Sequence, residues 1–486
     1  MPHSMLHSGV HSMIHSIHIG MQRCIALAIA LTAGCQTYTA KPLDLSQHRD
    51  AFLSRTLQAP DLTQFSAQLA APPTSAQSSF DLTDGVSLAE AECVALVFNA
   101  ELRRERLQAG ATLATAETAG LWTDPVLGVD FTKLLDASSS AWEVFGNIAF
   151  TLPLSGRLEL ETARVSTEHQ AQLTRVAAHE WETRVALRQL WTERAATALE
   201  FDATREFLAQ LELVIGIVDA METAGELSRT QARLFRVERA VQRNALLLRE
   251  SRLARSNLAL RALMGLPPNA VLACIDAPLS ASLSDAERLA IGSAIESRLD
   301  ATSLRLRAAG MDYTAAEQSL EAEVRAQYPD LVIGPGFGKQ DGDQQFLLGL
   351  SAPLGIFNGN RAGIARATAA REIARAAAET LLEDLVHALA DARASHTSAA
   401  LRRTSLETDM IPLVDAQRAD TRRVAEQGEV DTLLLLESLK TQQNAKILLI
   451  EALRDEVLAE LRLIEVAGEV AMEIALPINT TQETDS

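Results

Sequence analysis

The chain has 486 residues, a formal net charge of -19 at pH 7, and 47% apolar but only 4% aromatic residues. The length allows two to four ordinary domains or one elongated unit, and the apolar content excludes a disordered chain. The acidic balance argues against nucleic acid as a partner, because nucleic-acid phosphates attract basic surfaces and no basic patch with interleaved aromatics occurs.

The N-terminal region is predicted to be an export signal. Arg23 precedes the apolar stretch Cys24–Leu31, which is too short to span a bilayer. The small residues before Cys35 resemble the lipobox of bacterial lipoproteins. This resemblance implies that residues 1–34 are removed and that Cys35 carries a lipid anchor. Gln36, in place of an aspartate, favours the outer membrane. An ordinary secretory signal with an incidental cysteine is the alternative.

Histidine and cysteine spacing predicts no resident metal or cofactor. Four histidines recur every four residues and could bind metal on one helix face: His3, His7, His11 and His15. They precede the signal, and a start at Met21 would leave residues 1–20 untranslated. Cys93 and Cys274 have no histidine at zinc-ligand spacing, so we expect them to be buried small apolar side chains. No catalytic motif is present, so we predict that the protein is not an enzyme.

Four short segments alternate with period two and predict strands with one apolar face. Their apolar positions are Leu127, Val129 and Phe131; Ile148, Phe150 and Leu152; Leu331, Ile333 and Phe337; and Phe346, Leu348 and Leu350. The intervening positions are mostly small or polar, which is typical of a membrane barrel. Pro335 removes a ladder donor and is expected to mark a bulge or a bend. Four strands cannot close a barrel, so the chain is expected to form oligomers, and a trimer gives twelve strands.

Very long helices are predicted after each strand pair. The first runs from Arg157 to Thr223, turns at Gly225, and returns from Ser228 to Met264. Some sixty residues span about 90 Å and carry too many charges for a bilayer, so this hairpin is expected in an aqueous compartment. A second hairpin is predicted over residues 360–426 and 431–466, with a kink at Pro412.

The same unit occurs twice. Pro153 and Pro353 differ by 200 positions, Arg157 and Arg361 by 204, and Gly225 and Gly428 by 203, which indicates a duplication. The predicted domains are a signal peptide (1–34), a lipidated linker (35–86), a first repeat (87–268), a connector (269–286), a second repeat (287–468) and a disordered tail (469–486).

This order of elements resembles the TolC-type outer-membrane efflux protein family. The resemblance rests on "YPDLVIGPGFG", "LSAPLGIFNGNRAGIARA", the paired turns "AGELS" and "QGEVD", and the closing "ALRDEVLAELRLIEVAG". It implies a mainly α fold with a small β-barrel part. A homotrimer would form a 12-stranded barrel in outer-membrane lipid and an α-helical tunnel in the periplasm.

The resemblance also implies partners. The chain would be the passive exit duct of an efflux system, reached through a periplasmic adaptor from an inner-membrane pump, most simply of RND type. The alternatives are the channel of a type I protein secretion system, the outer-membrane component of a heavy-metal efflux system, and a periplasmic coiled coil with no channel. No cofactor is implied.

Acidic residues near the hairpin tips are the predicted pore residues, because threefold symmetry turns one carboxylate into a ring of three. They are Asp431, Glu437, Asp415 and Glu226. For Asp431 a helix N-terminal charge, and for Glu437 a solvated helix face, are the plainer interpretations. Gly225 and Gly428 are expected to mark the tips that contact the adaptor, besides serving as helix C-caps.

Overall fold

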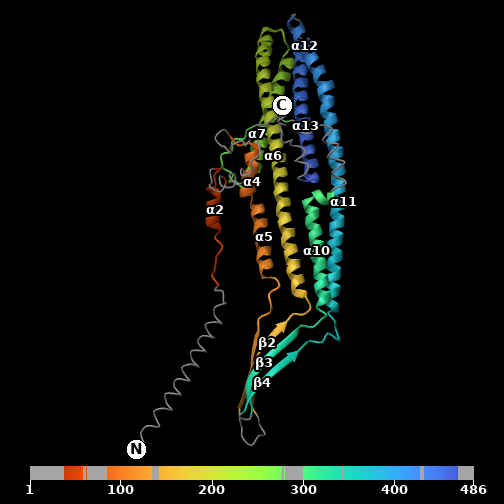
Figure 1. Cartoon of the computed structure of the whole chain (residues 1–486). Coiled ribbons are helices and arrows are strands. Elements are labelled where there is room, and N and C mark those ends of the chain that lie inside the picture. The colour runs from red at the N-terminus through yellow and green to blue at the C-terminus, as the bar shows by residue number, and fades with distance from the viewer. Residues whose placement is uncertain are drawn as a thin grey trace, which may run out of the picture. The chain divides into compact units, whose positions relative to one another are not determined.

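A computed structural model describes residues 38–57, 62, 85–133, 142–275, 279, 299–340, 343–426 and 432–468. The chain divides into two units, residues 1–54 and 55–486. The described part of the first unit holds helix α2 (Leu45–Leu53), whose first turn is capped by the Asp44 carboxylate at 2.9 Å from the Gln47 backbone nitrogen. All other elements belong to the second unit (Figure 1). No helix in these ranges is both long and apolar enough to cross a membrane.

The four predicted strands are confirmed and form one antiparallel sheet in the order β1-β2-β3-β4. The strands are β1 (Val126–Lys133), β2 (Trp142–Leu152), β3 (Leu331–Gln340) and β4 (Asp343–Ser351). Strand β2 pairs with β3 although about 180 residues separate them, so the two repeats join within the sheet. Each repeat contributes one hairpin to it.

Pro335 interrupts the β2–β3 ladder without a bulge. Asn147 pairs with Gly336 and Phe150 pairs with Ile333, which is the same register on both sides of the gap. A bulge would insert one extra residue and shift the register by one, so the unchanged register shows that there is no bulge. In place of the expected bulge there is a short break in pairing with β2, while Pro335 itself stays paired with Leu348 of β4.

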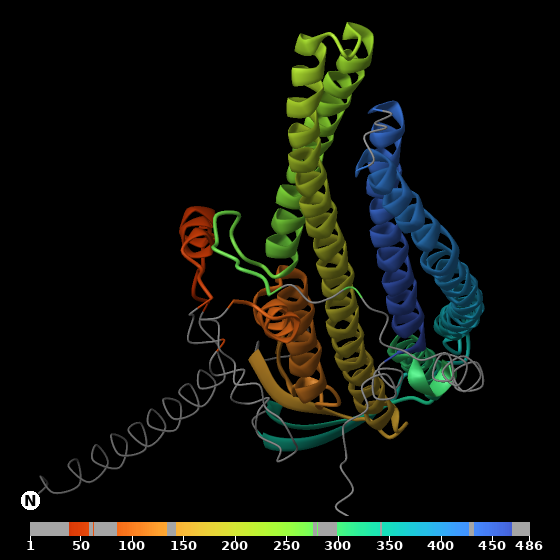
Figure 2. The same ribbon diagram turned by 90° about the horizontal axis from the view of Figure 1, so that it is seen from above.

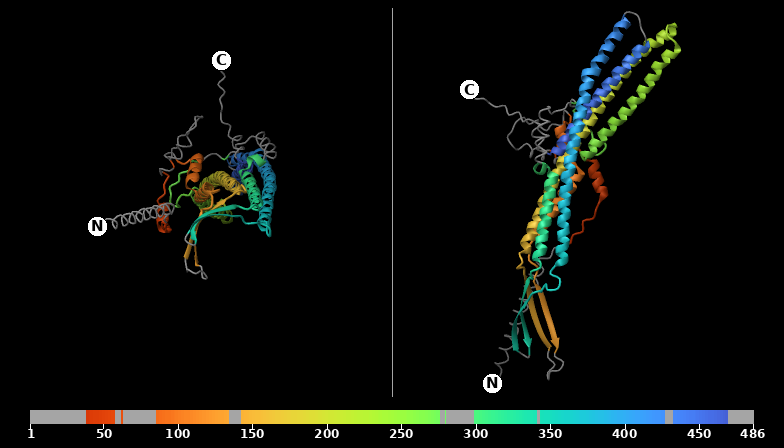
Figure 3. Two further views of the ribbon diagram at one scale, coloured as in Figure 1. Left: turned by 60° about the horizontal axis from the view of Figure 1, so that its bottom comes forward. Right: turned by 90° about the vertical axis from the view of Figure 1, so that its right-hand side faces the viewer.

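The helices confirm the predicted hairpins to within two residues. The first repeat has α4 (Leu88–Phe98), α5 (Ala100–Thr118), α6 (Arg157–Ala224) and α7 (Arg229–Leu263). The second has α9 (Leu299–Thr302), α10 (Leu304–Arg325), α11 (Arg361–Ser405), the π-helical turn η1 (Leu406–Met410), α12 (Ile411–Glu426) and α13 (Thr432–Ala467). Helix α6 alone has 68 residues and is about 100 Å long. The strands connect to one end of α6 and α11, and the turn between α6 and α7 lies at the other end of α6 (Figure 3).

The duplication extends to unusual backbone positions. Gly156 and Asn360 precede α6 and α11, differ by 204 positions, and both have positive φ, of 69° and 53°. Gly265 and Gly468 follow α7 and α13, differ by 203 positions, and have φ of 68° and 81°. Equivalent turns are thus built with equivalent backbone geometry in both repeats.

Two apolar clusters join the α6–α7 hairpin to the α11–α13 hairpin, which lie side by side in Figure 2. The junction cluster comprises Trp181, Val185, Leu299, Leu389, Ala392, Leu463, Ile464 and Ala467. The tip cluster comprises Phe207, Leu211, Ile215, Val218, Leu227, Ala232, Phe235 and Leu436. Long helices are stabilised by such tertiary packing more than by intrinsic propensity.

Two local expectations are corrected. Cys93, inside α4, and Cys274, after α7, are half-buried, not fully buried. The irregularity predicted at Pro412 is the π turn η1, which ends two residues before it and accommodates the missing backbone donor. The link from β4 to α11 takes nine residues, whereas the link from β2 to α6 takes four, so the two repeats differ in this link.

Candidate functional site

One face of the sheet is a continuous apolar surface. The register pairs Leu127 with Ile148, Phe150 with Ile333, and Phe337 with Phe346, and directly paired residues share a face. All twelve predicted barrel residues therefore lie on this one face. Most are strongly exposed, and Phe131 and Leu350 are 67% and 68% exposed. An apolar surface of this size indicates contact with lipid or another chain.

The height of this apolar face matches a bilayer. Along β2 it runs from Val144 to Leu152, a rise of about 27 Å, or about 21 Å for strands tilted as in membrane barrels. The apolar band of such barrels is about 25 Å tall. Lys133 and Lys339 lie on the same face at its outer end, beside the strand-connecting turns, and both are exposed. Lysines at the edge of an apolar band are typical of a membrane–water boundary.

The opposite face is mostly small and polar. Its positions on β3 are Val332, Gly334, Gly336 and Gly338, and those on β4 are Gln345, Leu347, Gly349 and Ser351. Its bulkiest side chain is Phe145 of β2, which pairs with Gly338 and Asp130. Small and polar residues on one face and apolar residues on the other are typical of a water-filled barrel wall.

The sheet is open at both edges. Strands β1 and β4 each pair with one neighbour among the described strands. An unpaired strand edge in hydrocarbon leaves backbone groups without hydrogen bonds, which costs several kcal/mol per group. The edges therefore require partner strands wherever this sheet meets lipid.

The first hairpin tip is a capped turn with an exposed acidic residue. Gly225 has φ of 80°, and the backbone nitrogens of Gly225 and Glu226 donate to the carbonyls of Glu222 (3.1 Å) and Met221 (2.9 Å). This pattern ends a helix in a left-handed cap. The Glu226 carboxylate is exposed, while Leu227 is buried in the tip cluster.

Arg236 fastens the two helices just below this tip. Its guanidinium on α7 contacts Asp219 at 2.7 Å and Glu222 at 2.5 Å on α6. Hydrogen bonds to Asp219 and Glu222 raise the pKa of Arg236. These pairs are solvent-accessible, so each contributes little to stability. The hairpin end is thus stabilised mainly by the tip cluster and, to a smaller extent, by the two ion pairs of Arg236.

The other predicted tip residues do not lie at one level. Glu437 and Asp415 are both exposed, and neither makes an ion pair within the described residues. Glu437 is five residues into α13, about 8 Å from its start, whereas Asp415 is eleven residues, about 17 Å, before the end of α12. The remaining predictions, Asp431, Gly428 and Cys35, lie outside the described residues.

Helix α7 carries an exposed apolar stripe. Leu234, Val237, Val241 and Leu248 recur at heptad spacing and are all exposed. A stripe of this period is the seam of a coiled coil and requires a facing helix. On α6, Leu213 and Ile217 are also exposed. These exposed apolar side chains are therefore not covered within one chain.

A buried carboxylate lies between the hairpins, midway along α6. Glu200 is 5% exposed and contacts Arg249 of α7 at 3.5 Å and Arg454 of α13 at 3.9 Å. Burial raises the pKa of Glu200, and the nearby arginines oppose this shift. The nearest apolar cluster here is small and contains Ala196, Ala203 and Ile450. The helices are thus joined by polar contacts in the middle and by apolar clusters nearer their ends.

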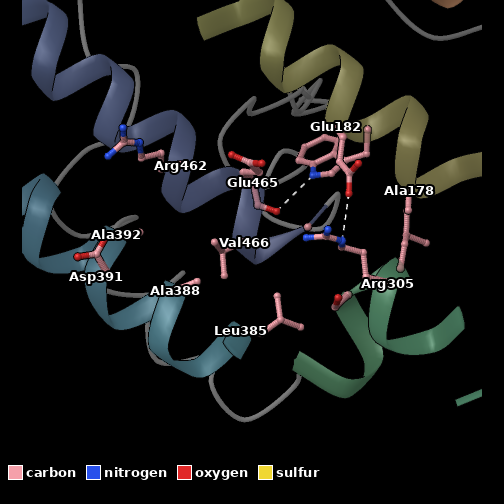
Figure 4. Close-up of a pocket in the computed structure, with 14 residues that line it drawn as sticks. Ala178, Glu182, Arg305, Leu385, Ala388, Asp391, Ala392, Arg462, Glu465 and Val466 are labelled. Carbon is pink, nitrogen blue, oxygen red and sulfur yellow. Dashed lines mark hydrogen bonds and ion pairs between the residues drawn. The ribbon is translucent and has the colours of Figure 1, made fainter. Parts of the chain in front are cut away.

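A cavity of about 390 Å³ lies beside the junction cluster, among α6, α10, α11 and α13 (Figure 4). Two pairs of its polar groups contact each other: Arg305 contacts Glu182 at 3.1 Å, and the Trp181 indole nitrogen donates to the Glu465 carbonyl at 3.4 Å. No group of three metal-ligating side chains occurs in the part of the chain that the structure describes. We assign no chemistry to this cavity.

Sequence reasoning missed two features. Phe145 was not singled out, although alternation from Ile148 places it on the small-residue face, where it is the one aromatic side chain among the described strand residues. The junction cluster was also missed, because Trp181 and Leu463 are almost 300 residues apart and no local pattern links them. The position of Phe145 could have been predicted from the strand alternation, whereas nothing in the sequence pattern indicated the junction cluster.

Comparisons with known proteins establish the fold. No family model matches the chain, and no curated protein matches it by sequence. Solved structures do match: the outer-membrane channel OprN has a TM-score of 0.66 at 16% identity, covering 90% of this chain and 99% of that chain. The outer membrane protein VceC of Vibrio cholerae gives 0.64 at 16%, covering 78% and 96%. The open state of the MtrE outer membrane channel of Neisseria gonorrhoeae gives 0.61 at 16%, covering 81% and 94%. The chain has the fold of these channels, as the sequence resemblance predicted.

Proposed function

We propose that this protein is the outer-membrane exit duct of a tripartite efflux system. Three copies would close a 12-stranded barrel in lipid and pack their hairpins into a periplasmic tunnel. The single observation that carries the proposal is the open four-stranded sheet with one continuous apolar face of bilayer height. Such a sheet is stable in lipid only when its edges are paired by further copies.

The helical part supports the same assembly. The exposed stripe on α7 requires a facing helix, and a neighbouring copy supplies one in a closed ring. The hairpins are too charged for a bilayer and much longer than one, which fits an aqueous tunnel. The fold shared with OprN and MtrE, both described as outer-membrane channels, agrees with this role.

The partners follow from the two ends of the hairpins. We propose that the tip around Gly225 and its counterpart around Gly428 contact a periplasmic adaptor, and that an inner-membrane pump of RND type delivers the cargo. The duct is passive and uses no catalytic residue or cofactor. A type I protein secretion channel and a heavy-metal efflux component remain the alternatives within this fold, and neighbouring pump genes would discriminate between them.

The test is to purify the protein in detergent and record single-channel currents in planar bilayers. We expect heat-modifiable trimers in outer-membrane fractions and stepwise ion currents after reconstitution. A soluble monomer that forms no channel would refute the proposal and favour a periplasmic coiled coil. Mass spectrometry of the mature N-terminus tests the anchor separately, because an unmodified Cys35 rules it out.

We also propose that four acidic residues line the pore, and the same channel recordings test this. In a trimer, Asp431, Glu437, Asp415 and Glu226 each form a ring of three charges. We expect Asp431→Asn and Glu437→Gln to weaken cation preference, measured as a smaller reversal potential in a salt gradient. Glu212→Gln is a matched control, because Glu212 is paired with Arg243 at 2.8 Å between α6 and α7. Unchanged cation preference in both tip variants would contradict the assignment.

A further inference from the structure

We propose that Phe145 sets the bore at the sheet end of the channel, with Gly336 and Gly338 as the positioning residues that hold its ring against the wall. The proposal rests on the proposed function, because it takes the small-residue face of the sheet as the inner wall. It concerns the end of the duct opposite the helical tips.

The inner wall is lined mostly by small or polar side chains. In register order from the helix end, the β2 positions on this face are Thr151, Ala149, Asn147, Phe145 and Glu143. Facing them on β3 are Val332, Gly334, Gly336 and Gly338, and Leu347 of β4 follows Gly336 across the sheet. Phe145 is the only aromatic side chain on this face among the described strand residues. Three copies would place three rings at one level of the barrel.

The Phe145 ring lies flat over strand β3 because two glycines leave room for it. A Cβ at Gly338 would lie 2.1 Å from Cδ2 of the ring, and a Cβ at Gly336 would lie 2.5 Å from Cε1. Real Cβ atoms do not approach other heavy atoms so closely, so any side chain at these positions would displace the ring. Gly336 is buried beneath the ring, and Phe145 itself is half-buried.

The displaced ring has one direction to move. Strand β3 lies beneath it, and Asp130 of β1 is its register partner on the other side. An added methyl at position 338 lifts the ring away from β3 and into the lumen. The two glycines thus form a recess that keeps the ring out of the bore, and the ring is the largest group on this wall available to narrow it.

The experiment is single-sided polymer exclusion on reconstituted channels. Polyethylene glycols of increasing mass are added to the compartment facing the sheet end, and the mass that no longer lowers conductance reports the bore at that end. This cut-off is independent of a constriction at the helical tips. We expect Phe145→Ala to shift it to larger polymers and Gly338→Ala to shift it to smaller ones. The cut-off measured from the tip end stays unchanged in both variants.

The double variant F145A/G338A identifies the cause. With no ring to displace, it should match Phe145→Ala, whereas independent effects would sum. Phe150→Ala is the matched control, since Phe150 lies on the apolar face of the same strand. If Gly338→Ala does not assemble, Phe145→Leu takes its place, with a shift to larger polymers that is smaller than for Phe145→Ala. Currents with unchanged sheet-end cut-offs would overturn this inference alone, whereas the absence of any current would overturn the proposed function.

Discussion

Two glycines with the same backbone conformation should respond very differently to alanine. Gly225 ends α6 at the hairpin tip and Gly265 ends α7, with φ of 80° and 68°. A Cβ at Gly225 would meet nothing within 4 Å, whereas at Gly265 it would lie 2.1 Å from the Phe98 carbonyl oxygen and 2.5 Å from its carbon. Gly225→Ala therefore measures the conformational cost alone, and Gly265→Ala adds a collision with backbone.

The magnitudes follow from these contacts. A left-handed conformation costs an alanine about 1–2 kcal/mol, so Gly225→Ala should lower the local opening free energy by about that amount. For Gly265→Ala the backbone of Phe98 must move by about 1 Å or more to reach ordinary contact. This strain raises the total to about 3–5 kcal/mol.

Native-state hydrogen–deuterium exchange of the intact protein measures both free-energy costs at individual amides. The exchange rate of an amide rises about tenfold for each 1.4 kcal/mol by which its local opening free energy falls. The reporter amides are Glu226, bonded to the Met221 carbonyl at 2.9 Å, and Leu266, bonded to the Arg261 carbonyl at 2.8 Å. We expect exchange about 5- to 30-fold faster at Glu226 in Gly225→Ala, and more than about a hundredfold faster at Leu266 in Gly265→Ala.

Gly110→Ala is the control for this pair. Gly110 lies inside α5, and a methyl group added there would have nothing within 4 Å, so alanine should improve helix propensity by about 1 kcal/mol and slow local exchange by up to about fivefold, the opposite direction. Equal effects at positions 225 and 265 would refute the close packing of Gly265 on Phe98. No effect of Gly225→Ala would refute the expected cost of placing an alanine in the left-handed conformation.

Three further predictions concern the helical part. Burial raises the pKa of the Cys93 thiol, so iodoacetamide at pH 8 should alkylate it several-fold more slowly than glutathione; equal rates would show it to be solvated. Burial and the nearby Glu451 raise the pKa of Glu200 in the folded protein, while Arg249, Arg252 and Arg454 oppose the shift. The stability that Glu200 contributes is therefore present below its unfolded pKa and lost as the pH rises through its folded pKa. Glu200→Gln should therefore lose less thermal stability than the parent between pH 4.5 and 7, and parallel pH profiles would contradict this. Trp181→Ala removes the largest side chain of the junction cluster and should lower the free energy of unfolding by about 3–5 kcal/mol. We expect a lower thermal midpoint for loss of helical signal, and a much smaller decrease for Trp181→Phe. Equal midpoints for the two variants would show that the cluster is not a packed core.

Much of the architecture was predictable because its signals are local. Period-two alternation identified the four strands, and the absence of proline between Pro153 and Pro267 identified the first long hairpin. The turn glycine at position 225 was likewise predictable, since left-handed helix ends strongly prefer glycine. The duplication was visible as a constant offset.

The candidate sites were less predictable, because exposure and level depend on neighbours that the sequence does not show. Glu226, Glu437 and Asp415 are all exposed as a pore role requires, but Glu437 and Asp415 lie at different heights along their helices. Pro335 was expected to bend or bulge its strand, and the unchanged register shows a gap in pairing with β2 and no bulge. A missing donor predicts a lost hydrogen bond, and only the paired strand shows whether an extra residue accompanies it.

The sequence by itself determined the elements, their lengths and their repetition, because periodicity, caps and breakers act within a few residues of one another. Only the tertiary structure decided which elements meet. It joined the two repeats through β2 and β3, placed Leu436 of α13 in the tip cluster of α6 and α7, and set the Phe145 ring on Gly338. Each of these contacts bridges roughly two hundred residues. Such contacts follow from register and side-chain packing across distant segments, which no local pattern encodes.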